Sequence, residues 1–122
     1  MDFHHTALRV RQNRLADAVL VLRECGLCNT VSIGTISAIC FARGGTCGVQ
    51  LIEAEDRLVP QRDRCHIAFL DEDPKAAAHD LAMRLRAHGL DVVEGCWSEA
   101  EQWLDVPDVF TDAVIEILSL PQ

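Results

Sequence analysis

The sequence predicts an α+β fold in which one βαβββ module occurs twice. At residues 3–24 and again at 66–88, a strand-like alternation of apolar and polar side chains leads into an amphipathic helix. Beyond the first strand, residues recur at a spacing of 63, so that Leu85 matches Leu22 and Gly89 matches Gly26. The rest of each copy is rich in residues that favour strands. We therefore expect two modules that form a curved, partly open eight-stranded sheet around a cavity.

Length and composition are those of one globular domain. The chain has 122 residues, of which 49% are hydrophobic and 25% charged, enough for a substantial core. We expect a single domain over 1–122, with a first module over 1–55, a connector over 56–63 and a second module over 64–122. No basic region followed by an apolar run opens the sequence, so we expect no signal peptide, no contact with a membrane and a cytoplasmic protein.

Charge and cysteine content exclude two further classes. The net charge of −8 argues against nucleic acid as a partner, because phosphate binding requires clustered Lys and Arg. The six cysteines do not indicate a disulfide framework, since nothing marks the chain for export. Cys25-Gly26-Leu27-Cys28 has the spacing of half a zinc site, but no second pair completes it. We interpret Gly26 as the cap that ends a helix.

The first module opens with a strand that has two distinct faces. Leu8 and Val10 lie on one face, while His5 and Arg9 lie on the other and point into the cavity. Asn13 can cap the helix that follows, which covers the Leu8 face. The apolar stripe of that helix consists of Leu15, Ala18, Val19 and Leu22.

Three strands complete the first module, at 31–33, 36–42 and 46–54. Gly44-Gly45 is typical of a two-residue hairpin loop, which would pair Ala42 with Cys47. In that register Cys40, Cys47 and Glu53 share one face of the sheet, and we expect the two cysteines to line the cavity.

The second module repeats this order. His66 and Leu70 face inward on its first strand, and Asp73-Pro74 is a strong start for a helix that ends at Gly89. Strands follow at 91–96, 102–106 and 109–118, and Pro107-Asp108 is the expected counterpart of the Gly44-Gly45 turn. This arrangement places Trp103 and Phe110 on the face of Glu116, as part of the cavity wall.

The residues that the repeat brings into register could hold a metal. His5 and His66 open equivalent strands, and Glu53 and Glu116 close equivalent strands. Two imidazoles and two carboxylates suit zinc or a divalent first-row ion such as Ni, Mn, Fe or Co. Such an ion could stabilise an oxyanion on a substrate with two adjacent oxygens, while a glutamate moves a proton. A single histidine or glutamate on a strand is more often structural or solvated. The repetition of both residue types favours the metal ligands.

These residues resemble a known superfamily. His5-Thr6-Ala7-Leu8-Arg9-Val10, His66-Ile67-Ala68-Phe69 and Val114-Ile115-Glu116-Ile117 are similar to the vicinal oxygen chelate superfamily, which includes glyoxalase I, methylmalonyl-CoA epimerase, extradiol dioxygenases and bleomycin-resistance proteins. In the glyoxalase I and epimerase branches, four strands each give one metal ligand, at the positions of His5, Glu53, His66 and Glu116. The resemblance implies that Glu116, more than Glu53, transfers the proton. It also implies a homodimer.

The sequence departs from that pattern in places and leaves two functions open. Asp105-Val106-Pro107-Asp108 lacks the glycine of the family's turn before the last strand. The first hypothesis is a metal-dependent lyase or isomerase of the glyoxalase type, acting on a small substrate with vicinal oxygens. The alternative is a non-catalytic protein, similar to bleomycin-resistance proteins, that binds a drug or metabolite in a cavity lined by Leu70, Trp103 and Phe110.

Overall fold

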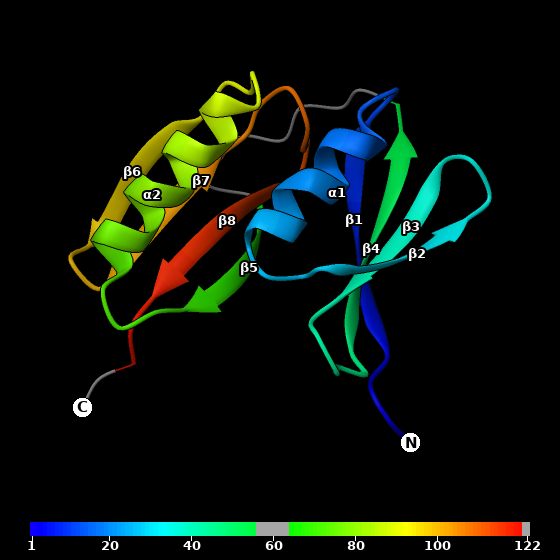
Figure 1. The fold of residues 1–122 in the computed structure, drawn as a ribbon, viewed down its shortest axis with the longest axis horizontal. Helices are drawn as coiled ribbons and strands as arrows, with labels where there is room; N and C mark the ends of the chain where they lie inside the picture. Colours follow the sequence, from blue (N-terminus) through cyan, green and yellow to red (C-terminus); the bar gives the residue numbers. More distant parts are fainter. Residues whose placement is uncertain (56–63, 121–122) are drawn as a thin grey trace. The chain divides into compact units, whose positions relative to one another are not determined.

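The computed structural model describes residues 1–55 and 64–120 and contains two βαβββ modules in sequence (Figure 1). This order confirms the α+β prediction of two repeated modules. The expected connector at 56–63 lies outside the described residues. The elements are β1 (His5–Arg11), α1 (Leu15–Glu24), β2 (Asn29–Ile33), β3 (Ser37–Phe41), β4 (Gly48–Ala54), β5 (Cys65–Leu70), α2 (Pro74–Ala87), β6 (Val93–Ser98), β7 (Glu101–Asp105) and β8 (Ala113–Leu118).

The eight expected strands are divided between two four-stranded sheets with the same topology. Their strand orders are β1-β4-β3-β2 and β5-β8-β7-β6. In each sheet the first strand pairs in parallel with the last strand of its module, and the other pairs are antiparallel. The antiparallel pair β3 and β4 places Phe41 opposite Gly48, which is the register predicted from the Gly44-Gly45 loop.

The chain divides into two compact units that follow the modules with one exception. Unit 1 contains Met1–Leu58 and Val109–Thr111, and unit 2 contains Val59–Asp108 and Asp112–Gln122. The backbone N–H of Arg11 donates to the carbonyl of Val109 over 2.9 Å, and Phe110 forms an isolated bridge with Val10. The predicted last strand at 109–118 is therefore too long, because its first residues pair with the edge of β1 and β8 begins at Ala113.

The core of unit 1 lies between α1 and the Leu8 face of its sheet. Leu8, Val10 and Leu51 are buried on that face, because the alternation along each strand sends these side chains toward the helix. The helix buries Ala18, Val21 and Leu22, so Val19 is not part of the buried stripe as predicted. Asn13 is not the N-cap either. It adopts a positive φ of 64° in the preceding turn, and Arg14 occupies the cap position without a side-chain hydrogen bond.

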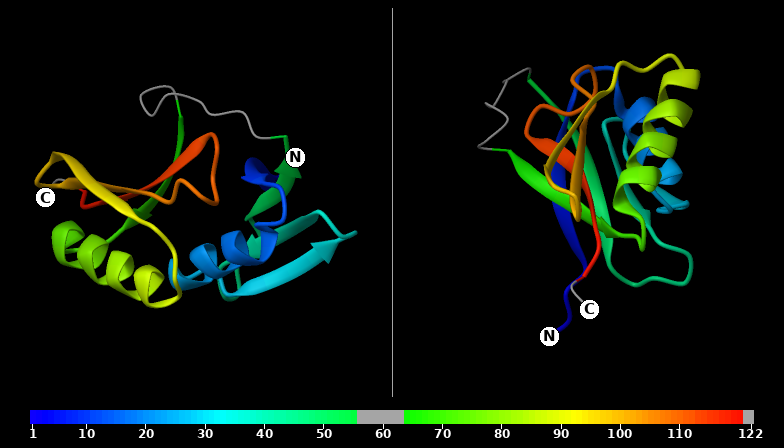
Figure 2. Two further views of the ribbon diagram at one scale, coloured as in Figure 1. Left: turned by 90° about the horizontal axis from the view of Figure 1, so that it is seen from above. Right: turned by 90° about the vertical axis from the view of Figure 1, so that its left-hand side faces the viewer.

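The helix of unit 2 begins and ends as predicted. The Asp73 carboxylate accepts a hydrogen bond from the Ala76 N–H over 3.1 Å, Pro74 is the first helical residue, and Gly89 has the positive φ of a helix-ending residue. The helix lies against one face of the second sheet (Figure 2), and five of its side chains are buried. These are Pro74, Ala78, Leu81, Ala82 and Leu85. In the described part of the chain, no helix is both long and apolar enough to cross a membrane.

Replacing the Asp73 cap should destabilise the protein measurably. We expect Asp73→Ala to lower the free energy of unfolding by about 1 kcal/mol, because an N–H of the first helical turn loses its acceptor. Urea denaturation followed by circular dichroism measures this loss. Asp80→Ala is the control, since Asp80 only pairs with Arg84 on the exposed surface of the same helix. Equal losses in the two variants would contradict the capping role.

Candidate functional site

The two predicted ligands of unit 2 lie side by side. In the parallel pair β5 and β8, His66 is opposite Val114 and Ala68 is opposite Glu116. His66 and Glu116 therefore project from the same face of the sheet, the face that α2 does not cover. His66 Nδ1 lies 3.1 Å from Glu116 Oε2. The glutamate side chain is 11% exposed and the histidine side chain 41% exposed, so solvent reaches the pair mainly from the histidine side.

The two predicted ligands of unit 1 do not lie together. In the parallel pair β1 and β4, His5 is opposite Gly48, whereas Glu53 is opposite Val10. The offset of five residues puts His5 and Glu53 at different ends of the pair and on opposite faces of the sheet. Glu53 Oε1 instead accepts a hydrogen bond from the Leu15 N–H over 3.3 Å. The prediction that Glu53 shares a site with His5 is therefore wrong, because this carboxylate caps the positive end of α1.

Gln50 occupies the position in unit 1 that Glu116 occupies in unit 2. Glu116 lies two residues beyond the strand partner of His66, and Gln50 lies two residues beyond the strand partner of His5. The Gln50 amide donates from Nε2 to Ser37 Oγ over 2.9 Å, which directs the amide and leaves its carbonyl oxygen as an acceptor. Sequence reasoning missed this residue because it matched glutamate to glutamate at a spacing of 63.

Aromatic rings surround the His66–Glu116 pair. The His66 ring stacks on Trp97, with centroids 4.6 Å apart and planes at 29°, and Trp97 lies 6.4 Å from Trp103. His66 and Trp97 come from the two edge strands of the sheet, β5 and β6. Three strand spacings of about 4.8 Å separate such strands in a flat sheet. The rings nevertheless touch, on the side of the sheet where Glu116 of β8 and Trp103 of β7 are strand partners.

A nearly buried ion pair lies on the same sheet as His66 and Glu116. Arg64 precedes His66 by two residues on the same face, and its Nη1 lies 2.7 Å from Asp105 Oδ1. Both of these side chains are nearly buried, so removing either one would leave an uncompensated charge in the interior. Among residues 1–55 and 64–120, no group of three or more His, Cys, Asp or Glu side chains is close enough to hold a metal ion.

Comparison with solved structures finds several glyoxalases. The chain superposes on a "possible glyoxalase" from Bacillus cereus with a TM-score of 0.64 and 18% identity, covering 97% of this chain and 98% of that chain. For a lactoylglutathione lyase from Agrobacterium tumefaciens the values are 0.56, 17%, 95% and 91%. For the trypanothione-dependent glyoxalase I of Leishmania major they are 0.58, 17%, 98% and 86%.

The chain has the glyoxalase fold. This confirms the fold that the resemblance to the vicinal oxygen chelate superfamily predicted. No protein-family model matches the sequence, and no curated protein matches it. At such low identity the likeness to solved structures concerns the fold, so an activity has to be argued from the side chains.

Within this glyoxalase fold, two residues predicted to line the cavity belong to the core. Cys40 lies opposite Val49 on the face that α1 covers and is fully buried. Burial raises the pKa of its thiol, although a contact with Thr30 and the charge of Arg23 act in the other direction. Phe110 is buried at the edge of β1. The prediction failed for Cys40 because it assigned the helix-covered face of the sheet to the cavity, and for Phe110 because residues 109–111 pair with β1 and are not part of β8.

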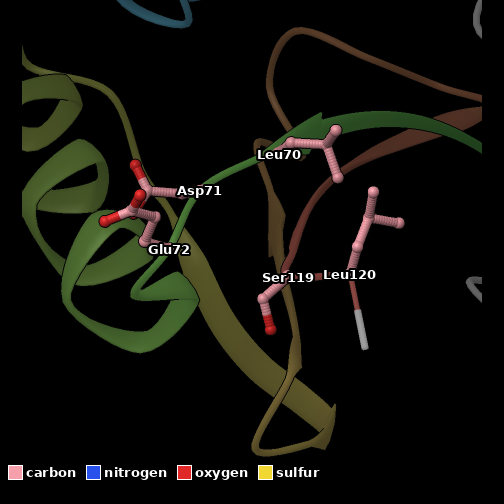
Figure 3. A pocket seen from close by; sticks show the side chains of 5 residues that line it. All are labelled: Leu70, Asp71, Glu72, Ser119 and Leu120. Atoms are coloured by element: carbon pink, nitrogen blue, oxygen red, sulfur yellow. The ribbon is translucent and has the colours of Figure 1, made fainter. Parts of the chain in front are cut away.

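Three other predicted cavity residues, Arg9, Cys47 and Leu70, are exposed, and Trp103 is half-buried. Arg9 lies on the open face of the first sheet, as expected from its alternation with Val10. Cys47 precedes β4, and its thiol donates to the Phe3 carbonyl over 3.2 Å. Leu70 lines a hollow of about 840 Å³ at the end of β5. In that hollow Leu70 and Leu120 lie on one side, and the Asp71 and Glu72 carboxylates on the other (Figure 3).

Burial should make Cys40 the slowest cysteine to be alkylated. All six cysteines are free, and Cys28, Cys47, Cys65 and Cys96 are exposed. We expect iodoacetamide at pH 8 to modify the exposed thiols and to leave Cys40 intact, because both access and thiolate formation are restricted. Peptide mass mapping measures the modification of each site, with urea-unfolded protein as the control. Modification of Cys40 at the rate of Cys96 would contradict its placement under α1.

Proposed function

We propose that the protein is a divalent-metal-dependent lyase or isomerase of the glyoxalase type, acting on a small substrate with two adjacent oxygens. The observation that carries this proposal is the His66–Glu116 pair, with its 3.1 Å separation, on the open face of a sheet in a glyoxalase fold. The comparisons support the fold, and the pair supplies the chemistry.

The geometry of the pair fits a metal ion. Nitrogen and carboxylate ligands lie about 2.0 to 2.2 Å from zinc. Two neighbouring ligands at such distances, at angles near 90° to 110°, are about 3 Å apart. His66 Nδ1 and Glu116 Oε2 have this separation, so an ion could bind both atoms with little movement of either side chain. A bound divalent ion would act as a Lewis acid toward the substrate oxygens.

Unit 1 offers a matching pair with different chemistry. His5 and Gln50 occupy the equivalent strand positions, and a glutamine carbonyl can ligate a hard cation but cannot take up a proton. Glu53, the second carboxylate expected from the sequence, caps α1. We therefore assign proton transfer to Glu116 alone, a carboxylate that is largely shielded from water beside two indole rings.

The aromatic surroundings favour a second candidate function. The exposed indole ring of Trp97 beside His66 would also suit a non-catalytic protein that binds a flat drug or metabolite. In that case the ligand would bind without metal, and ligand binding would change the tryptophan fluorescence.

Metal binding tests the first proposal directly. We expect His66→Ala and Glu116→Gln to weaken the binding of Zn²⁺ or Co²⁺ at least tenfold, because each removes a ligand atom. His79→Ala is the matched control. His79 of α2 lies 3.3 Å from Glu94 of β6 in a more exposed pair, and its loss should not affect the metal. Isothermal titration and the visible spectrum of bound Co²⁺ measure affinity and ligation. Unchanged binding in the first two variants would refute the proposed ligands.

Activity separates Glu116 from Glu53. Metal-loaded protein should be screened against hemithioacetals, acyl-CoA epimers and catechols. On any substrate that turns over, we expect Glu116→Gln to lower kcat by about 10²- to 10⁴-fold, because the general base is lost. Glu53→Gln should leave kcat unchanged and only weaken the cap of α1. If both variants retain full activity, Glu116 does not transfer the proton.

A further inference from the structure

One edge of the first sheet is open to another strand. β2 is the edge strand in the order β1-β4-β3-β2 (Figure 1), and in the described part of the chain it pairs only with β3. The backbone N–H and C=O groups on its outer side can therefore bond to a further strand. All five residues of β2 are exposed. The helix of this unit packs mainly against β1, β3 and β4, so it does not shield β2.

Exposed apolar side chains follow this edge. Val31 is 55% exposed and Ile33 44% exposed, and Ile36, in the turn that leads to β3, is 52% exposed. Thr30, Val31 and Ile33 of β2 are β-branched, and such residues stabilise the pairing of strands. Both the backbone and the side chains of β2 are therefore suited to accept a neighbouring strand.

No charged side chain protects this edge. Residues 25–42 contain no Asp, Glu, Lys, Arg or His, although the whole chain has a net charge of −8. By contrast β6, the edge strand of the second sheet, contains Glu94 and is flanked by Asp91 and Glu99. Charged side chains on an edge strand hinder its pairing with other chains. The sequence gives this protection to β6 and withholds it from β2.

We propose that β2 pairs in antiparallel orientation with β2 of a second copy of this chain, so that the two first sheets form one continuous sheet. Identical strands are self-complementary in this orientation, because a twofold axis matches the donors of each strand with the acceptors of the other. Val31 is the central residue of β2. With the axis there, the two Val31 side chains lie opposite each other on the sheet face that α1 does not cover.

The charge distribution favours a second copy as the occupant. Two molecules with a net charge of −8 repel each other, and the repulsion is smallest where the contact surface has no acidic side chain. A basic partner would instead gain most from the acidic surfaces elsewhere on the chain. A twofold dimer also uses both β2 edges and leaves neither for further addition. Because β2 belongs to unit 1 and the His66–Glu116 pair to unit 2, this inference does not depend on the proposed function.

Sedimentation velocity of the full chain measures the dimer. We expect a Kd of about 10 µM, because pairing two strands of five residues buries less surface than a standard interface. Raising NaCl from about 20 to about 300 mM should strengthen association several-fold, since salt screens the repulsion between acidic copies. A monomer at every concentration up to about 300 µM would overturn the proposal and leave the edge to a strand of another protein. A dimer that salt weakens would also overturn it.

Val31→Lys and Val93→Lys are matched variants. Each replaces a valine of an edge strand, 55% exposed on β2 and 50% exposed on β6, and each changes the net charge equally. Val31→Lys places two like charges opposite each other at the axis and should raise the Kd at least about tenfold. Val93→Lys should leave the Kd unchanged. Circular dichroism verifies folding, and Ile33→Lys replaces Val31→Lys if that variant does not fold. Equal Kd values for the β2 and β6 variants would contradict pairing through β2.

Hydrogen exchange locates the surface independently of any variant. Backbone amides that gain a partner in the dimer exchange more slowly. Between about 1 and 100 µM protein, we expect exchange in residues 29–33 to slow and exchange in residues 93–98, the β6 control, to stay the same. A dimer in which residues 29–33 exchange at the same rate at both concentrations forms through another surface, and this result would refute the proposal.

Discussion

The register between parallel strands decides which side chains can act together in this protein. In each unit the first strand pairs with the last strand of its module, and side chains alternate between the two faces. Glu116 lies two residues beyond the strand partner of His66, and this even offset keeps both side chains on one face. Glu53 lies five residues beyond the strand partner of His5. This odd offset sends Glu53 to the helix-covered face and His5 to the open face. The backbone pairing thus determines the chemistry of each face.

Much of the fold was predictable because it follows from local patterns. Alternation and amphipathic periodicity gave the order of strands and helices, Asp73-Pro74 gave the start of α2, and Gly44-Gly45 gave the register of β3 and β4. The N-terminal end of α1 was not predictable, because its cap is the remote carboxylate of Glu53 instead of a side chain nearby in sequence. The extent of β8 was also wrong, since residues 109–111 pair with β1.

The candidate site was predictable only in part. The sequence pointed to His66 and Glu116, because apolar and polar residues alternate regularly in both of their strands and this alternation places the two side chains on one face. Sequence reasoning missed Gln50. Insertions make the spacing of the repeat vary along the chain, so pairing glutamate with glutamate did not identify the residue at the equivalent register position. The close approach of the Trp103 indole to the sheet has a weak signal in the sequence, namely a glycine inside the β6 strand. Its meaning depends on Trp103 lying opposite, which only the pairing of β6 with β7 reveals.

The assignment of Val109–Thr111 to unit 1 bears on how such a protein can be dissected or shuffled. Although the modules are repeats, the first half of the chain does not contain every residue of the first unit. A fragment that ends between the repeats would leave the outer edge of β1 without its bond to Val109, and an unpaired strand edge invites association with other chains. Separate expression of the halves would therefore expose this edge, and recombination between homologous repeats would have to preserve the short return segment as well as the modules.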